Sequence, residues 1–387
     1  MPEHRDATSS PPLLITSADS LAALVERLSA APLLAFDTEA ASFHRYTDRV
    51  YLIQVSSVTE TAVVDPLAVQ DLTPLGNLLA DPGIEVVFHD ADYDLRSLDR
   101  DYGFRVRRVF DTRIAAQLLG EPEIGLNALL QKYFGVRLDK KYQRADWSQR
   151  PLTPEMIAYA AADTRHLPAL KEAFERRLSD QGRLEWAREE FVRLESIRWS
   201  PGEPDEAYLR LKGAKVLPPQ SLAVLRAVHA WRETEARALD RATFRICMNE
   251  TLLALAKHAP ATREALEIIR EIPTPIAKRY GDRFLTEVRA ALALPSESWP
   301  RIERRRVEKR FDPAIDARLE RLKAMRNARA QELGLEPGVL CPNGTLEAIA
   351  RSEAKDPTAP GAVSELRAWQ CEAVGAGRIL AALPEPG

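Results

Sequence analysis

Two carboxylates stand close together at the end of an apolar run near the N-terminus. The stretch is "LLAFDTEAASF", residues 33–43, and its pattern predicts a buried strand that carries Asp37 and Glu39. Side chains at positions i and i+2 of a strand point to the same face, so both carboxylates share one surface and Thr38 points to the other. A divalent cation with oxygen ligands would stabilise the repelling pair. A solvated strand edge explains two such residues equally well.

A third carboxylate follows another short strand. The segment "VVFHDADYDLRSLDRDYG", residues 86–103, runs from an apolar strand into a helix. Helical spacing places Asp94 beside the stripe that Ala91, Leu95 and Leu98 are expected to bury, close to the carboxyl end of the strand. Asp111, in "FDTR", competes with Asp94 as a metal ligand.

A tyrosine and a fourth carboxylate lie on one predicted helix, "EMIAYAAADTRHLPAL", residues 155–170. Tyr159 and Asp163 are four residues apart and therefore share a helix face. The three alanines between them allow a backbone or a substrate to approach closely. A tyrosine in the middle of a helix is more often a packing residue, so this pair is weak evidence by itself.

The elements that must position these residues change in type along the chain. Up to about residue 180, short apolar strands mix with amphipathic helices, a pattern that predicts an α/β domain. After "RWSPGEPDEAY" the strand signals nearly vanish and only helical patterns remain. These helices form two sets in one order, since "WRETEARAL" and "ETLLALA" in the first correspond to "MRNARAQEL" and "GTLEAIA" in the second. We interpret this as a weak repeat of one small helical domain.

Taken in order, these motifs resemble the D-E-D-D exonucleases, which are 3'-to-5' nucleases of the ribonuclease H-like superfamily. Tyr159 indicates the tyrosine variety. The resemblance narrows to the ribonuclease D family through "LIQVSS", "VFDTRIAAQLLG" and "IGLNALLQKYFGVRLDKKYQRADWSQRPLTPEMIAYAAADTRHL", and it extends over residues 13–384. It implies an α/β ribonuclease H-like exonuclease domain, with a mixed sheet flanked by helices, followed by two small all-α HRDC-like domains. RecQ-type helicases share this small nucleic-acid-binding domain.

The resemblance also implies a domain order. We expect a disordered tail at 1–12, the 3'-5' exonuclease domain at 13–200, a linker at 201–216, the first HRDC-like domain at 217–298, a basic linker at 299–312 and the second HRDC-like domain at 313–384. The basic linker contains "RIERRRVEKR", which is either a solvated hinge or a strip that contacts RNA. The second helical copy matches less well because its loop "LGLEPGVLCPNG" is rich in proline and glycine.

Carried over to this sequence, the resemblance makes four residues the metal ligands and catalytic carboxylates, Asp37, Glu39, Asp94 and Asp163. They would hold two divalent ions, Mg²⁺ or Mn²⁺. Two such ions about 3.5–4 Å apart stabilise both the nucleophile and the leaving oxygen of a phosphodiester. Tyr159 would address the attacking water. Because a phenol with a pKa of about 10 is a poor base at neutral pH, we expect Tyr159 to orient that water by a hydrogen bond.

Further residues lie in family-like motifs near the expected cleft. We expect substrate contacts from Thr38, Phe43, His44, Gln54, His89, Tyr142, Trp147 and Arg150. Aromatic faces stack on unpaired bases, and Arg150 can meet phosphate. Ordinary packing, or a solvated loop, explains each of these residues about equally well.

The leading functional hypothesis is a metal-dependent 3'-5' exoribonuclease that releases nucleoside 5'-monophosphates from an RNA with a free 3' end. Maturation of tRNA precursors or other stable RNA is the expected role. One alternative is a DNA-directed 3'-5' exonuclease, although no polymerase region follows. Another is a catalytically silent nucleic-acid-binding protein, although all the carboxylates are present.

Composition restricts the domain number, the binding surfaces and the cellular compartment that we expect. The 387 residues suit more than one domain, and a net charge of -3 means that a local basic patch would have to bind a polyanion. No apolar run reaches the roughly 18 residues of a membrane helix, and the first residues lack the apolar segment of a secretory signal. Three widely separated cysteines without C-x-x-C spacing fit a reducing compartment. We therefore expect a cytoplasmic monomer without membrane contact or organic cofactor.

Overall fold

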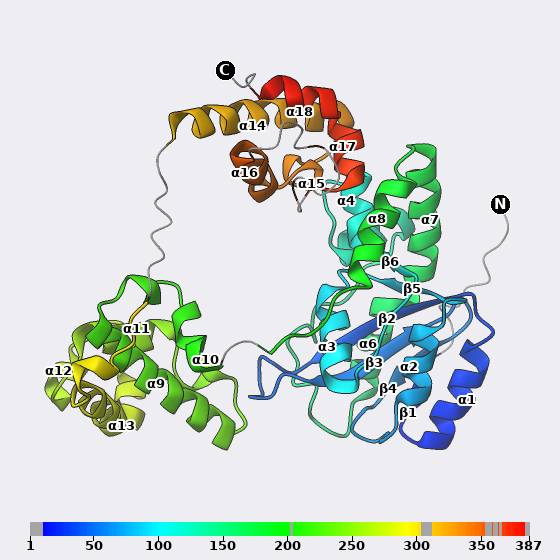
Figure 1. The fold of residues 1–387 in the computed structure, drawn as a ribbon. Coiled ribbons are helices and arrows are strands. Elements are labelled where there is room, and N and C mark those ends of the chain that lie inside the picture. The colour runs from blue at the N-terminus through cyan, green and yellow to red at the C-terminus, as the bar shows by residue number, and fades with distance from the viewer. Residues whose placement is uncertain are drawn as a thin grey trace.

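The structure is a computed structural model that describes residues 11–201, 204–302, 312–352, 358, 363 and 366–383. Figure 1 shows the chain from N- to C-terminus. Most of the predicted tail and most of the predicted basic linker lie outside the described residues.

The centre of the first domain is a mixed sheet of six strands, counted over the described residues, in the order β1-β4-β3-β2-β5-β6. Strand β2 is antiparallel to β3 and parallel to β5. Strands β3 and β4 are antiparallel, whereas β1 with β4 and β5 with β6 are parallel. The strands are Leu13–Ile15 (β1), Leu33–Ala40 (β2), Val50–Ser56 (β3), Thr61–Val64 (β4), Glu85–Phe88 (β5) and Val109–Asp111 (β6). The predicted mixed α/β fold is confirmed.

Helices cover both faces of this sheet (Figure 1). Phe36 and Phe88 pack on one side among leucines of the helices that follow β1, β4 and β5, while Ala35 and Val87 pack on the other. Burial on both sides explains why β3 is apolar almost throughout. The helices are Ala18–Leu28 (α1), Thr73–Ala80 (α2), Asp92–Tyr102 (α3), Thr112–Leu118 (α4), Leu126–Phe134 (α5), Pro154–Arg165 (α6), Leu167–Asp180 (α7) and Leu184–Leu194 (α8).

The second half of the described chain is helical. The first helical domain comprises Pro219–Ala238 (α9), Thr243–Ile246 (α10), Asn249–His258 (α11), Arg263–Glu267 (α12), Thr274–Leu292 (α13) and the 3-10 turn Ser296–Ser298 (η4). Two 3-10 helices precede it, Pro204–Arg210 (η2) and Ala214–Val216 (η3), within the stretch predicted as a linker. Tyr208 and Ala214 of this stretch are buried in the core of the helical domain. The packed unit therefore begins before residue 217.

The second helical domain comprises Pro313–Leu333 (α14), Pro337–Leu340 (α15), Asn343–Arg351 (α16), Ala368–Val374 (α17) and Ala376–Ala382 (α18). One buried contact recurs in both helical domains. Nη1 of Arg232 donates to the Cys247 carbonyl at 3.3 Å and to Asn249 Oδ1 at 2.8 Å. Nη1 of Arg326 donates to the Cys341 carbonyl at 2.9 Å and to Asn343 Oδ1 at 2.8 Å. This shared arginine contact supports the internal repeat predicted from the sequence.

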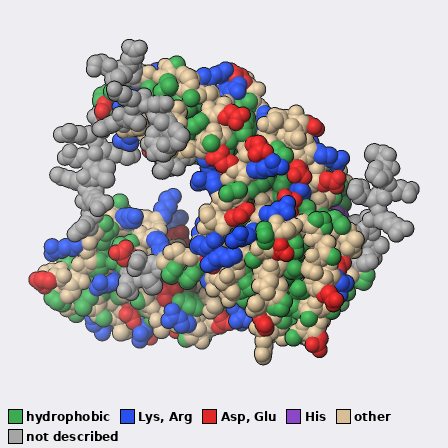
Figure 2. Space-filling view, turned by 45° about the vertical axis from the view of Figure 1, so that its right-hand side comes forward, with side chains coloured by type: hydrophobic (Ala, Val, Ile, Leu, Met, Phe, Trp, Pro, Cys, Tyr) green, Lys and Arg blue, Asp and Glu red, His purple; other side chains and the backbone are tan. Residues whose placement is uncertain are grey.

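The two helical domains attach to different parts of the exonuclease domain (Figure 1). The first lies at the loop between β2 and β3, where the Ala242 amide donates to the His44 carbonyl at 3.2 Å. The second packs α17 on α8, where the rings of Trp186 and Trp369 stack with centroids 5.4 Å apart. In Figure 2 an opening lies between the two helical domains beside the exonuclease domain, and Lys and Arg side chains stand at its edge.

Among the helices that the structure describes, none is long and apolar enough to cross a membrane.

Candidate active site

Three of the four predicted carboxylates meet where α6 crosses β2. One oxygen from each of Asp37, Glu39 and Asp163 lies within 4.8 Å of the other two. All three residues are partly exposed, so solvent reaches the cluster. Oxygen ligands gathered at this spacing suit a hard divalent cation.

The strand sets the direction of the first two carboxylates. Asp37 pairs with Gln54 of β3, Glu39 pairs with Leu52, and the register shifts between Glu39 and Ala40. Leu52 belongs to the apolar cluster that also contains Ala160 and Ala161 of α6, which places this face of β2 under that helix. The predicted alternation of side chains between the two faces of β2 is therefore present.

Asp94 reaches the same strand from the other side of the sheet. It lies in the first turn of α3, is 6% exposed, and its Oδ1 accepts a hydrogen bond from the Thr38 hydroxyl at 2.5 Å. Asp94 is not among the three mutually close ligands, but burial and then the charge of Asp37 raise its pKa. Thr38, predicted as a substrate contact, instead holds a candidate metal ligand in place.

Helix α6 is fixed against the sheet at the position of Asp163. Ala160 and Ala161 are fully buried, which lets the helix backbone approach β3 closely. The Ser56 hydroxyl of β3 lies 2.8 Å from the Thr164 hydroxyl, so a hydrogen bond ties the helix to the strand beside Asp163. Thr153 caps the start of the helix by accepting the Met156 amide at 3.2 Å.

The carboxylates strongly resist ionisation. Burial, followed by the charge of Asp163, raises the pKa of Asp37 to about 8. Burial raises the pKa of Asp163 to about 7. The pKa values of Glu39 and Asp94 lie well above the usual carboxyl range, through burial first and neighbouring carboxylates second. Bound cations would lower these pKa values, because they favour the charged carboxylates.

Tyr159 lies one helical turn before Asp163, beside the acidic cluster. Burial and the charges of Asp163 and Glu39 raise the pKa of its phenol, which therefore stays neutral and can hydrogen-bond. Two aromatic residues of the preceding loop pack around it: the ring of Tyr142 is 5.7 Å away and that of Trp147 is 6.0 Å away. Trp147 is only 1% exposed, so its indole supports Tyr159 and presents no open face to a base.

Asp111, the competing carboxylate, organises the backbone. It caps α4 by accepting the Arg113 amide at 2.8 Å and the Ile114 amide at 3.1 Å, and it also accepts the Ala91 amide at 2.7 Å. Because these bonds join the starts of α3 and α4, Asp111 fixes the segment from which Asp94 projects.

Arg150 is already occupied by protein groups. Its guanidinium donates to both oxygens of Asp65, at 2.6 and 2.7 Å, and to the carbonyls of Tyr51 and Trp147 at 3.0 and 2.8 Å. A phosphate would have to displace these bonds. The geometry assigns Arg150 to the support of its loop and gives no support to the predicted phosphate contact.

Two other predicted substrate contacts lie inside the domain. His89 Nδ1 is 2.9 Å from the Thr112 hydroxyl, and burial lowers the pKa of His89 to about 4, so the ring is neutral at pH 7. Gln54 is fully buried opposite Asp37, and neither atom of its amide has a partner among the described residues.

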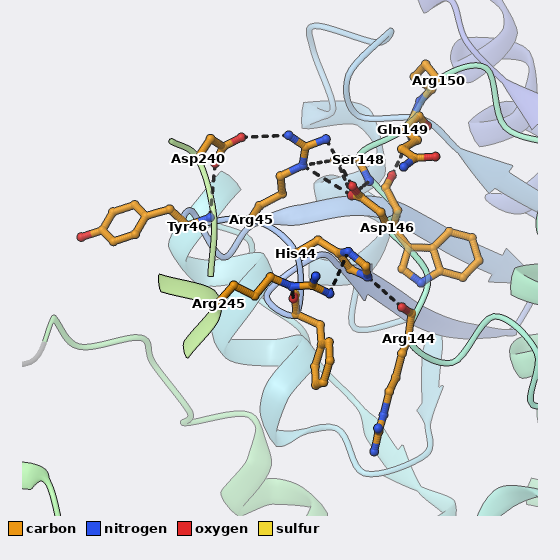
Figure 3. Close-up of polar contacts among 12 residues, drawn as sticks. His44, Arg45, Tyr46, Arg144, Asp146, Ser148, Gln149, Arg150, Asp240 and Arg245 are labelled. Atoms are coloured by element: carbon orange, nitrogen blue, oxygen red, sulfur yellow. Dashed lines mark hydrogen bonds and ion pairs between the residues drawn. The ribbon is translucent and has the colours of Figure 1, made fainter. Parts of the chain in front are cut away.

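Phe43 and His44 lie where the exonuclease domain meets the first helical domain, since both contact Arg245 of that helical domain. Figure 3 shows His44 beside Arg245. His44 Nε2 is 2.8 Å from the Arg144 carbonyl, and its Nδ1 is 3.3 Å from Nη2 of Arg245. Arg245 also donates from Nε to the Phe43 carbonyl at 2.7 Å. The sequence patterns did not single out Arg144, Phe244 or Arg245. No local pattern points to Arg245, because it lies 202 residues from Phe43 along the chain.

Comparison with known proteins shows the family to which the chain belongs. A 3'-5' exonuclease family matches residues 12–179, and the HRDC domain family matches residues 221–288 and 316–383. These matches define the chain as a 3'-5' exonuclease that carries two HRDC domains. Ribonuclease D of Gluconacetobacter diazotrophicus is 35% identical over 342 residues, which cover 88% of this chain and 86% of that protein. The chain belongs to the ribonuclease D family and is an exoribonuclease.

Solved structures show the same architecture. The crystal structure of Escherichia coli RNase D aligns with a TM-score of 0.70 at 27% identity, covering 88% of this chain and 90% of the other. A protein from Bifidobacterium adolescentis aligns with a TM-score of 0.80 at 26% identity, covering 97% of this chain and 98% of the other. The predicted family and domain types are therefore confirmed.

Proposed function

We propose that this exoribonuclease uses Asp37, Glu39, Asp94 and Asp163 to hold two divalent ions, Mg²⁺ or Mn²⁺, and releases nucleoside 5'-monophosphates from RNA 3' ends. The observation that supports this most strongly is the cluster of three carboxylates from β2 and α6, with ligand oxygens within 4.8 Å of one another. The raised pKa values of these groups support it too, because such groups gain most from a bound cation.

Each side chain has a distinct task in this proposal. Bound divalent ions supply charge that stabilises both the attacking and the departing oxygen. Asp37, Glu39 and Asp163 provide oxygen ligands from two rigid elements, and Thr38 fixes the rotamer of Asp94. The neutral Tyr159 phenol hydrogen-bonds the attacking water and aims it at the phosphorus. Tyr142 and Trp147 keep that phenol in position.

We further propose that the substrate is structured RNA with a free 3' end, such as a tRNA precursor. The relative from Escherichia coli is described as an exoribonuclease involved in structured RNA processing. The two HRDC domains offer additional surface beside the catalytic domain, which suits a substrate larger than its single-stranded end.

A timed digestion of 5'-labelled RNA tests the proposal. With Mg²⁺ or Mn²⁺ we expect a descending ladder and released 5'-monophosphates, and with chelator we expect intact RNA. Asp37→Asn should slow the reaction on the order of a thousandfold, because losing a ligand removes several kcal/mol of transition-state stabilisation. The matched control is Asp180→Asn, which removes an exposed carboxylate at the end of α7. Full activity of Asp37→Asn would refute the assignment, and faster cleavage of matched DNA would change the substrate class.

A further inference from the structure

Two phenylalanine rings meet on the surface where the exonuclease domain and the first helical domain join. Phe43, in the loop after β2, and Phe244, in α10, lie edge to face with centroids 5.0 Å apart. Both remain open to solvent, at 43% and 38% exposure. Rings that served only to hold two domains together would be buried, so these open faces are available to a ligand.

Two arginines flank this aromatic pair. The Arg144 guanidinium lies 5.2 Å from the centre of the Phe43 ring, and that of Arg245 lies 5.9 Å from both rings. In the part of the chain that the structure describes, no carboxylate pairs with Arg144 or Arg245. Arg45 in the same region differs, since it pairs with Asp146 and with Asp240, each at 3.2 Å. Among the described residues, the positive charges beside the rings therefore have no carboxylate partner.

Hydrogen bonds across the junction join the segments that carry these four side chains. Arg245 donates to the Phe43 carbonyl, and the Ala242 amide donates to the His44 carbonyl. His44 lies between Arg144 and Arg245, as Figure 3 shows. Since each domain contributes one ring and one arginine, this surface exists only when the two domains are docked.

We infer that Phe43, Phe244, Arg144 and Arg245 form a subsite for single-stranded RNA, which we call the junction subsite. The rings would stack on an unpaired base, and the two guanidiniums would pair with adjacent phosphates. Aromatic faces with unpaired arginines are the combination that binds single strands without reading sequence. The inference rests on the proposed action on RNA. Its location fits, because Phe43 follows the strand that carries Asp37 and Glu39.

The first experiment removes the ring faces and keeps the apolar contact. We expect Phe43→Leu combined with Phe244→Leu to weaken binding of a fluorescein-labelled 12-nucleotide oligouridylate by at least about tenfold, measured by fluorescence anisotropy of the full chain in chelator. Tyrosine at both positions should restore wild-type affinity. Phe134→Leu is the matched control, since Phe134 is a phenylalanine of α5 with 39% exposure.

The second experiment tests the arginines. Arg144→Gln and Arg245→Gln should each lower the slope of log affinity against log salt by about 0.7, the value for one phosphate contact on a single strand. Arg107→Gln, which removes an exposed arginine elsewhere on the exonuclease domain, should leave the slope unchanged.

Two results would overturn the junction subsite: wild-type affinity in the double leucine variant, or an equal loss of hydrolysis on a dinucleotide and on the 12-mer, which would place the defect in the catalytic site. A wild-type protein that neither binds nor cleaves RNA would instead refute the proposed function itself.

Discussion

At the scale of single residues, the acidic cluster links stability to pH. The folded-state pKa of Asp37 is about 8 and that of Asp163 about 7, against an ordinary value of 3.8 in the unfolded chain. At any pH between the unfolded and the folded pKa values, the unfolded chain binds fewer protons than the folded one. The free energy of unfolding without metal should therefore fall as pH rises from about 4 to about 8.

Thermal unfolding in chelator measures this effect. We expect the midpoint to drop on the order of 5 °C between pH 5 and pH 8 in excess of a variant with Asp37→Asn and Asp163→Asn, whose profile should be flatter. Mg²⁺ should raise the wild-type midpoint more at pH 8 than at pH 5, because binding requires ionised carboxylates. Identical profiles for wild type and variant would contradict this explanation.

Tyr159 should act through hydrogen bonding. Because its raised pKa keeps the phenol neutral, we expect Tyr159→Phe to lower kcat roughly 100-fold and to change KM little. Metal binding followed by calorimetry should be unaffected, since the three close carboxylates remain. Tyr93→Phe, which removes the hydroxyl that donates to Asp48 at 2.8 Å, serves as the control. Unchanged kcat in Tyr159→Phe would remove Tyr159 from the mechanism.

Residues of the site differ in how far the sequence predicts them. Asp37 with Glu39 and Tyr159 with Asp163 are spaced by local periodicity, which strand and helix geometry convert directly into a shared face. Arg150 is different, because its partner Asp65 is 85 residues away and the pairing is set by the fold. Long-range partners decide whether an arginine is free for phosphate, and one sequence without its fold does not contain that information.

At the scale of elements, the buried arginine of each helical domain fixes the end of one short helix and the start of the next. Arg232 and Arg326 are 4% and 7% exposed and bond the same pair of groups in each copy. We expect Arg326→Met to destabilise its domain by about 2–3 kcal/mol, because a buried carbonyl and an amide lose a charged donor.

Arg232→Met should produce a similar loss in the first helical domain, and urea unfolding of the full chain would show either loss as an early transition. The control is Lys323→Met, whose ion pair with Glu320 on α14 is partly exposed and worth less than about 1 kcal/mol. Losses no larger than that of the control would show that the repeated contact does not stabilise the domains.

Element types follow from periodicity more surely than element boundaries do. The apolar runs that form β1 to β5 were predicted as strands, whereas the three-residue strand β6 was not singled out. The 3-10 helices at 204–216 were assigned to a linker because proline and glycine dominate the stretch that precedes them. Tyr208 and Ala214 of these helices are buried in the core to which α9 also contributes, a tertiary contact that local composition does not show.

At the scale of the whole molecule, the two helical domains are attached by different chemistry. The second is held by the stacked indoles of Trp186 and Trp369 and by Glu189, which accepts the amides of Ala368 and Trp369 at 2.9 and 2.8 Å. The first is held largely by polar contacts, among them Asp240 accepting the Tyr46 amide at 3.2 Å. Ionic contacts are screened by salt, whereas apolar stacking is not. The second domain also has an ion pair, Arg367 with Glu190 at 2.9 Å, but its stacked indoles should keep it attached when salt screens ionic contacts. The first helical domain should therefore be the one that salt detaches first.

Arg45 contributes to this attachment because it bridges Asp146 of the exonuclease domain and Asp240 of the first helical domain. We expect Arg45→Gln and Asp240→Asn to favour an undocked first domain, seen as a larger radius of gyration in X-ray scattering at 0.3 M salt. Glu60→Gln, which breaks the exposed pair with Arg27 inside the exonuclease domain, should leave the radius unchanged.

Undocking also separates Phe43 from Phe244. Asp240→Asn should therefore weaken binding of the 12-nucleotide oligouridylate in proportion to the undocked fraction, although Asp240 carries a negative charge whose removal would by itself favour RNA. Tighter binding of the oligouridylate by Asp240→Asn would show that removing the negative charge has a larger effect on affinity than separating the two domains. Weaker binding, together with the larger radius, would show that the two domains bind single-stranded RNA as one surface.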